Sequence, residues 1–335
     1  MSVEMDFLEQ CHQTTRVGTP RGACTPAGAC TPRGVRQRYQ EPARTAFPWL
    51  GGKGWMQKKL GHRLPRKLQC YVEPFAGAAA MLLGLPRMSV EVLNDRNQDL
   101  VNFYRVMQQP SLRDSLLDRL RWTPYARDEF VRALQMLEGA DQSMDKVERA
   151  WAFFVVANAT FSGGGQSGIT ENRFATSSQR SQGQRMHYHI DGLPGIAERL
   201  RHVVIENRCA QQILPQYDSP DTLFFLDPPY FPETRSIRHE TSRGTYAGGE
   251  MSAQDHIRML EICLDLEGYV VLCGYPHEAY DDVLLPHGWE ILTFDRYAMT
   301  SLHRDQQKSQ RQECLWINPK MARHFAQGAQ QSLFG

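Results

Sequence analysis

Net charge is almost absent from this chain. Lys and Arg number 38 and Asp and Glu number 37 in 335 residues, which leaves a net charge of +1 at neutral pH. Such a protein has no global field that would attract nucleic acid, so any basic binding surface has to be local. The hydrophobic fraction of 41% is that of a globular protein with a substantial core.

Cysteine pairs and long apolar runs are also missing. The eight cysteines are scattered without a CxxC or CxxxC pair, which argues against a zinc cluster. The absence of a signal peptide argues against a disulfide scaffold. No apolar run approaches the roughly 18–20 residues that span a bilayer. We therefore expect reduced thiols, no metal, no membrane partner and a cytoplasmic location.

Residues 1–44 are poor in residues that could build a core. A short Cys-Thr-Pro unit recurs at 24–26 and 30–32, after a related Gly-Thr-Pro at 18–20. Gly, Pro and Thr at this density cannot bury enough surface to offset the loss of chain entropy. We predict a disordered tail, with a basic DNA-contacting arm as the alternative.

From residue 46 onward, strand and helix signals alternate. The pattern predicts strands over 69–72, 89–93, 202–205, 222–226 and 269–273, and helices over 76–85 and 98–108. Two more strands, over 289–293 and 314–317, have no helix between them and are expected to pair as an antiparallel hairpin at the sheet edge. Alternating strands and helices predict an α/β fold, with a mostly parallel sheet covered by helices on both faces.

Residues 110–200 interrupt this alternation. A helix is predicted over 145–158, where apolar residues recur at helical spacing, and a polar Gly-rich stretch follows at 161–168. An insertion of this size within an α/β sheet is typical of a functional subdomain.

The most informative motif is Asp227-Pro228-Pro229-Tyr230, directly after the apolar strand 222–226. The prolines cannot donate to a sheet ladder or continue a helix, and they hold the chain extended. A carboxylate and a carbonyl could accept the N–H groups of a planar amine while the Tyr230 ring stacks on its face. A strand that simply ends in a Pro-rich turn is the alternative.

Two further motifs follow predicted strands. Residues 73–80, Glu-Pro-Phe-Ala-Gly-Ala-Ala-Ala, have small side chains that let a ligand approach the backbone, although a plain tight turn is also possible. Asp95 ends the next strand, where an acid suits the hydroxyls of a ribose, unless Asn94 and Asp95 merely cap the following helix. Together they favour an adenosine-containing cofactor.

Residues 47–54 invite comparison with a phosphate-binding loop, but they fail the pattern. Position 47 is Phe where the first Gly is required, and position 54 is Gly rather than Ser or Thr. Lys53 could instead bind a carboxylate, and Trp49 offers a π face to a cation.

Weaker signals come from histidines and arginines. His187 and His189 could ligate a metal from one strand face, but without a third ligand nearby they are expected to be surface histidines. The basic loops over 235–243 and 301–311, with Arg173, Arg180 and Arg185, would form a phosphate-binding rim if they surrounded one cleft; otherwise they are solvated.

In their order along the chain, these motifs resemble the Dam-type DNA adenine methyltransferases. The matching segments are 49–53, 71–77, 93–100 and 225–230, and residues 313–318 are similar to the closing strand of phage and prophage members. The resemblance implies a Rossmann-like methyltransferase fold that uses S-adenosylmethionine. It divides the chain into a catalytic domain, 45–109 and 201–320, an inserted target-recognition subdomain, 110–200, and a C-terminal tail, 321–335.

The resemblance also implies roles for single residues. Cofactor contacts are expected from Trp49, Lys53, Glu73, Phe75, Gly77, Asp95 and Asp227. Asp227 and the Pro228 carbonyl would accept the amine hydrogens, and Tyr230 would stack on the base. Phe231 would wall the pocket, and Arg173, Arg235 and Arg238 would contact DNA. Ala78, Ala79 and Ala80 depart from the family, which often has a small polar residue after the Gly.

The implied reaction is methylation of the N6 amine of an adenine flipped out of duplex DNA. The same corner would serve a cytosine N4 amine or RNA, and a catalytically silent DNA-binding relative is a third reading. The expected partner is double-stranded DNA, with a cognate restriction nuclease as a further candidate and a monomer or weak dimer as the assembly. The Gly-rich stretch 161–168 does not match recognition residues of the family, so no target sequence is inferred.

Overall fold

The computed structural model describes residues 45–61, 63–65, 67–139, 143–161, 169–231, 251–297 and 310–332. These residues belong to one compact unit. The predicted tail over 1–44, most of the Gly-rich stretch 161–168, the loop that carries Arg235 and Arg238, and nearly all of the loop 301–311 lie outside the described residues.

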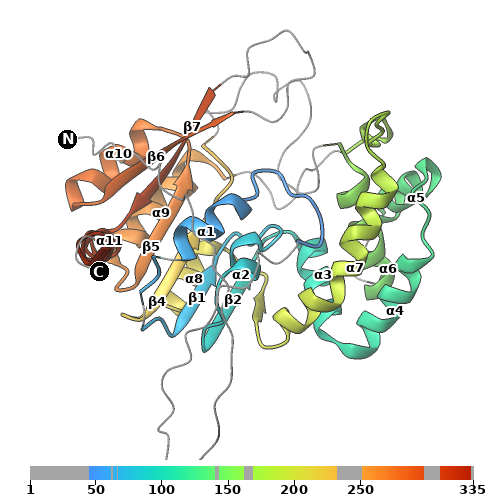
Figure 1. The fold of residues 1–335 in the computed structure, drawn as a ribbon, viewed down its shortest axis with the longest axis horizontal. Helices are drawn as coiled ribbons and strands as arrows, with labels where there is room; N and C mark the ends of the chain where they lie inside the picture. The colour runs from blue at the N-terminus through green and yellow to red at the C-terminus, as the bar shows by residue number, and fades with distance from the viewer. Residues whose placement is uncertain are drawn as a thin grey trace, which may run out of the picture. The chain divides into compact units, whose positions relative to one another are not determined.

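Seven strands in the described residues form a single sheet in the order β3-β2-β1-β4-β5-β7-β6 (Figure 1). Five strands, β3, β2, β1, β4 and β5, run parallel to one another. The strand β7 runs antiparallel to both β5 and β6. Their bounds are β1 Cys70–Glu73, β2 Val90–Asn94, β3 Val204–Glu206, β4 Thr222–Leu226, β5 Tyr269–Gly274, β6 Glu290–Tyr297 and β7 Gln310–Ile317. The mostly parallel sheet and its antiparallel edge hairpin are confirmed.

The central strands β1, β4 and β5 are buried on both faces. Successive side chains of a strand point to opposite faces, and helices cover each face. In β4, Leu223 and Phe225 join one hydrophobic cluster, and Phe224 and Leu226 join another. The second cluster is completed by α8 Ala210–Gln216, α9 Ala253–Asp265 and α10 Glu278–Leu284. On the opposite face lie α1 Gln57–Gly61, α2 Ala80–Gly84, α3 Gln98–Gln108 and α11 Pro319–Ser332.

The inserted region is helical and packs against α3. It contains α4 Pro110–Arg121, α5 Arg127–Glu138, α6 Lys146–Ala159 and α7 Gln182–Leu200. The predicted helix over 145–158 is α6, and Asp145 caps its start by accepting from the amides of Val147 and Glu148. From Ala150 to Ala159 every residue of α6 is buried, which makes it the central helix of this region.

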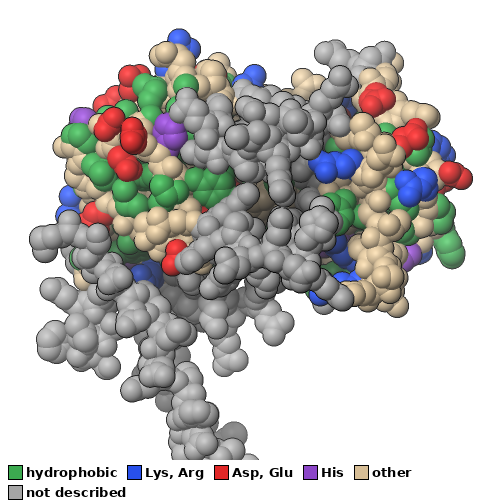
Figure 2. Space-filling model, turned by 90° about the horizontal axis from the view of Figure 1, so that it is seen from above, with side chains coloured by type: hydrophobic (Ala, Val, Ile, Leu, Met, Phe, Trp, Pro, Cys, Tyr) green, Lys and Arg blue, Asp and Glu red, His purple; other side chains and the backbone are tan. Residues whose placement is uncertain are grey.

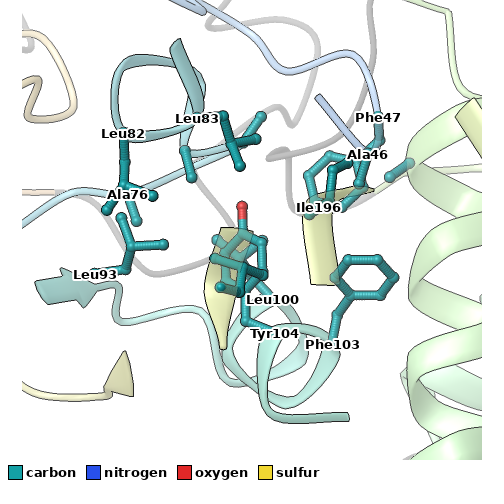
Figure 3. Close-up of a cluster of buried hydrophobic side chains, with 14 of the residues drawn as sticks. Ala46, Phe47, Ala76, Leu82, Leu83, Leu93, Leu100, Phe103, Tyr104 and Ile196 are labelled. Carbon is teal, nitrogen blue, oxygen red and sulfur yellow. The ribbon is translucent and has the colours of Figure 1, made fainter. Parts of the chain in front are cut away.

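Aromatic side chains join the inserted region to the sheet. Phe47 meets the rings of Phe103 on α3 and Phe153 on α6, with centroids 5.4 and 5.3 Å away. Figure 3 shows Phe47 and Phe103 in one cluster with Ile196 of α7 and Leu93 of β2. The segment that begins at residue 45 is therefore anchored in this shared core before it reaches the sheet edge.

A buried ion pair makes a second connection. Arg199 of α7 binds both carboxylate oxygens of Glu91 in β2, one of them at 2.6 Å, and donates to the Leu82 carbonyl of α2. Both side chains are largely buried, so loss of either partner would leave an uncompensated buried charge where α7 meets the sheet.

The exposed charges are mixed. On the face in Figure 2, the described Lys and Arg side chains are interspersed with Asp and Glu. This agrees with the near-zero net charge and leaves any DNA-binding surface to local groups of basic residues. No helix in the described part of the chain combines the length and the apolar character that a membrane crossing needs.

One sequence prediction needs correction, and the strand assumed for the alternative of a histidine metal site is not found. The helix predicted over 76–85 is only α2 Ala80–Gly84, because Gly77 and Ala79 have left-handed backbones, with φ of 47° and 52°, that no helix accommodates. His187 and His189 lie on helix α7 rather than on a strand, and His189 Nδ1 lies 2.9 Å from the Thr45 carbonyl. Two positions apart on a helix, they do not share a face.

Candidate active site

A cleft lies at the edge of the sheet where β1, β2 and β4 end. Ligands of open α/β sheets bind at this edge, beyond the carboxyl ends of the parallel strands. The cleft encloses about 900 Å³, counting the space at its open mouth. Its lining comes from 49–53, 73–81, 95–97 and 225–230, together with Met251. All four segments with motifs therefore meet in one place.

The loop after β1 is held open by its own backbone geometry. The Gly77 carbonyl accepts from the Tyr104 hydroxyl of α3 at 2.6 Å, and the Ala76 amide donates to the Asn94 carbonyl at 2.9 Å. A Cβ at position 77 would lie only 2.5 Å from Nε1 of Trp49. Glycine is thus required twice, for the left-handed turn and for the close approach of the indole.

Asp95 ties the second loop to the first. Its Oδ2 accepts from the Gly77 amide at 3.0 Å and its Oδ1 from the Asn97 amide at 2.9 Å. The N-cap of α3 is Asn97, whose side chain accepts from the amides of Asp99 and Leu100. Asp95 is therefore not the helix cap that was one of its two readings. Burial raises the pKa of its carboxyl, and the amide donors offset part of the rise.

Lys53 is the hub of the cleft. Its Nζ lies 2.9 and 3.0 Å from the two carboxylate oxygens of Asp227, 2.7 Å from the Tyr230 hydroxyl and 2.7 Å from the Gly51 carbonyl. These partners use the three N–H donors of an ammonium group. The Lys53 side chain is 3% exposed. Residues 174 positions apart are thus joined where the four motif segments meet.

The charges of this group are set by burial and by each other. Burial acts to lower the pKa of Lys53, but Asp227 and Tyr230 outweigh it and hold that pKa well above its ordinary value. Burial raises the pKa of the Asp227 carboxyl, and the Lys53 ammonium counteracts the rise. Burial also raises the pKa of Tyr230 well above its usual range. Lys53 is therefore a buried positive charge beside Asp227 that favours the ionised form of its carboxyl.

Glu73 lines the cleft but is committed to the fold. Its Oε1 accepts from the Tyr71 hydroxyl at 2.8 Å and from the Leu82 amide at 2.6 Å. Burial raises the pKa of its carboxyl to about 8, against the lowering effect of these two donors. At neutral pH the Glu73 carboxyl is therefore mostly protonated, and its hydrogen bonds hold the loop between β1 and α2.

Some of the expected site residues lie together and others do not. The cleft is lined by nine of the expected residues: Trp49, Lys53, Glu73, Phe75, Gly77, Asp95, Asp227, Pro228 and Tyr230. Phe231 is not among them: it is 6% exposed and stacks on His277 with centroids 3.8 Å apart. Arg173 ends a short 3-10 helix of the inserted region and is not a lining residue. Arg235 and Arg238 fall outside the described residues.

Sequence reasoning missed Arg96 and Met251, which also line the cleft. Arg96 follows Asp95 directly, so its place could have been inferred. Met251 is buried just before α9, far from every motif, and nothing local in the sequence marks it. Within the ranges that the structure describes, no group of three or more His, Cys, Asp or Glu side chains is arranged to hold a metal ion.

The raised pKa of Glu73 predicts a pH-dependent stability. The folded protein keeps a proton that the unfolded chain releases, so this group stabilises fully below its ordinary pKa of 4.5, and that stability is lost as the pH rises toward about 8. Glu73→Gln keeps an oxygen acceptor and removes the titration. It should flatten the fall in the free energy of unfolding from about pH 5 to 8, measured by urea denaturation. Exposed Glu290→Gln is the control; equal slopes for wild type and Glu73→Gln would contradict the assignment.

Comparison with known proteins gives the site its context. The family model of D12 class N6 adenine-specific DNA methyltransferases matches residues 49–278. The type II methyltransferase M1.LlaDCHI of Lactococcus lactis subsp. cremoris is 25% identical over 235 residues, which are 67% of this chain and 78% of that protein. The DNA adenine methylase of Haemophilus influenzae is 24% identical over 229 residues, 67% of this chain and 75% of that protein.

A phage protein matches a shorter region. The DNA N-6-adenine-methyltransferase of Escherichia phage P1 is 29% identical over 133 residues, 38% of this chain and 17% of that protein. The family match covers the four segments that form the cleft, from Trp49 through the loop after β4. The chain belongs to the D12 class of N6 adenine-specific DNA methyltransferases.

Proposed function

We propose that the cleft binds S-adenosylmethionine and that the 227–230 corner presents the N6 amine of a flipped-out adenine to its methyl group. The observation that carries the proposal is that the loops holding Gly77 and Asp95 share one cleft with Asp227 and Tyr230. A cofactor and an amine bound to these two groups of residues would lie side by side. Cytosine and RNA are not favoured, because the family is adenine-specific and acts on DNA.

The residues present fit this cofactor. No side chain would fit at position 77, because its Cβ would clash with the Trp49 indole. A ligand at this point would therefore contact the backbone of Gly77 and the edge of the indole. Backbone amides donate to both oxygens of Asp95, and a carboxylate has about four acceptor sites, so capacity remains for a ribose hydroxyl. Phe75 and Met81 add apolar surface. When bound, S-adenosylmethionine supplies a methyl group that its sulfonium already activates.

The corner after β4 would align the amine. Asp227 and the carbonyl of Pro228 each accept one amine hydrogen, which turns the nitrogen lone pair toward the methyl group. Asp227 serves as an acceptor and need not remove a proton before transfer. Because Lys53 holds both Asp227 oxygens at 2.9 and 3.0 Å, an incoming amine has to share or take over one of these contacts. The Tyr230 ring offers its face to the base.

We infer DNA contacts from the inserted region and from the basic segment after the catalytic corner. We infer that 110–200 recognises the target sequence, beside a catalytic domain made of 45–109 and 201–320. Extrusion of a paired adenine costs about a few kcal/mol, which protein–DNA contacts must supply. Arg173 belongs to this region, and Arg235 and Arg238 follow the catalytic corner in sequence. All three are proposed to bind phosphates.

The proposal of a protein partner is based on the proteins that this chain is similar to. One of them is a type II methyltransferase, so a cognate restriction nuclease is a proposed partner. A monomer or weak dimer is proposed as the acting form.

The role of Asp227 can be tested against a control acid, Asp221, at the other end of β4. Asp227→Ala should lower the rate of methyl transfer at least about a hundredfold, since it removes a preorganised acceptor from the reacting centre. Asp221 lies exposed just before β4, so Asp221→Asn should leave the rate unchanged. Transfer of labelled methyl groups to unmethylated DNA measures the rate, and gel shifts should show intact duplex binding. Near-wild-type transfer by Asp227→Ala would exclude it from the site.

Lys53 should matter for the cofactor. Lys53→Met removes the charge but keeps most of the apolar stem, and it leaves Asp227 without its counter-ion in the cleft. Affinity for S-adenosylmethionine should fall about tenfold or more, because the Asp227 and Tyr230 side chains that line the cleft lose the charged donor that holds them. Calorimetry without DNA measures it, with exposed Lys146→Met on α6 as the control. Equal affinities of Lys53→Met and wild type would remove Lys53 from the cofactor site.

A further inference from the structure

Tyr275 is an aromatic residue beside the catalytic corner that no motif marks. It follows β5 directly, and β5 runs parallel to β4 with Leu272 opposite Leu226. The segments that leave these two strands therefore emerge side by side at the cleft edge of the sheet. Tyr275 is half-buried. Its ring centroid lies 4.4 Å from that of Tyr230, at an interplanar angle of 65°.

The two tyrosines have different relations to the cleft. Tyr230 is among the lining residues and Tyr275 is not, and the ring contact with Tyr230 connects Tyr275 to the lining of the cleft. The opposite end of Tyr230 is held by its hydroxyl, which accepts from Lys53 at 2.7 Å. A side chain with two χ angles is fixed when both its ring and its hydroxyl are held. These two contacts set the plane of the ring.

A second aromatic pair joins the same two segments. Phe231, next to Tyr230, stacks on His277 with centroids 3.8 Å apart and planes 29° apart. His277 also accepts from the Ala279 amide and caps α10, which fixes the segment that carries Tyr275. The consecutive rings of Tyr230 and Phe231 thus pair with those of Tyr275 and His277 respectively, which both follow β5.

The composition of the corner explains why side chains have this task. Pro228 and Pro229 have no N–H, so this backbone cannot be fixed by donating to a neighbouring strand. Edge-to-face aromatic packing has a preferred geometry as well as an apolar gain. It can therefore orient Tyr230 where backbone pairing is not available.

We propose that Tyr275 is a positioning residue for the target base: it sets the plane of the Tyr230 ring against which the flipped adenine stacks. The inference rests on the proposed function of the corner and adds a residue to it. The proposed role of Tyr275 is this ring contact, because Tyr275 is not among the residues that line the cleft. Its loss should therefore slow methyl transfer without weakening cofactor binding.

The test compares Tyr275→Leu, Tyr275→Phe and Tyr269→Leu with wild type. Tyr269 is half-buried at the other end of β5, under Lys320, so Tyr269→Leu makes the same change at the opposite end of this strand, away from the cleft. Single-turnover transfer of labelled methyl groups to unmethylated bacterial genomic DNA is measured at saturating DNA. The affinity for S-adenosylmethionine is measured by calorimetry.

Tyr275→Leu should lower the single-turnover rate about tenfold or more, because a misplacement of about 1 Å can cost a hundredfold. Its cofactor affinity should stay within about twofold of wild type, and Tyr275→Phe should restore the rate because it retains the ring. An unchanged rate in Tyr275→Leu, or an equal loss in Tyr269→Leu, would overturn the inference. Absence of transfer in the wild type would instead overturn the proposed function, and this inference with it.

Discussion

The contact of Lys53 with Asp227 is the interaction on which the cleft depends. A carboxylate at the end of a fully buried strand is costly to keep ionised, and breaking a buried ion pair costs about 3–5 kcal/mol because one charge is left behind. Lys53, at 3% exposure, supplies the opposite charge and reaches the Tyr230 hydroxyl from the same nitrogen. One ammonium group therefore connects the segment 49–53, which is anchored beside α6, to the corner where the amine is proposed to bind.

Around this contact, the strand ends supply the rest of the site. Gly77 and Asp95 leave β1 and β2 at the same edge and bind each other, so two neighbouring loops form one rigid wall. Glu73, Tyr71 and Tyr104 brace this wall from inside the fold. The two acids have different partners: Glu73 accepts hydrogen bonds from Tyr71 and the Leu82 amide and has a pKa raised to about 8, whereas Asp227 faces the Lys53 ammonium.

Much of this was predictable from the sequence, for physical reasons. Apolar strands such as 222–226 and the helix 98–108 have strong periodic signals, and parallel strands bring their following motifs to one edge. What the sequence did not predict depends on tertiary contacts. The loop at Gly77 replaces the first turns of a predicted helix because Asp95, 18 residues away, holds its amide. Phe231 turns into the core because His277 lies beside it, and Tyr275 gains its place only from strand pairing.

The cleft is proposed to methylate adenine in DNA through Asp227. The most direct test is expression of the wild-type chain and of Asp227→Ala in a host without DNA methylation, followed by sequencing that reports modified bases in context. N6-methyladenine at a recurring sequence is expected with the wild type, and none with the variant. Modified cytosine, no modification at all, or methyladenine that persists with Asp227→Ala would contradict the account.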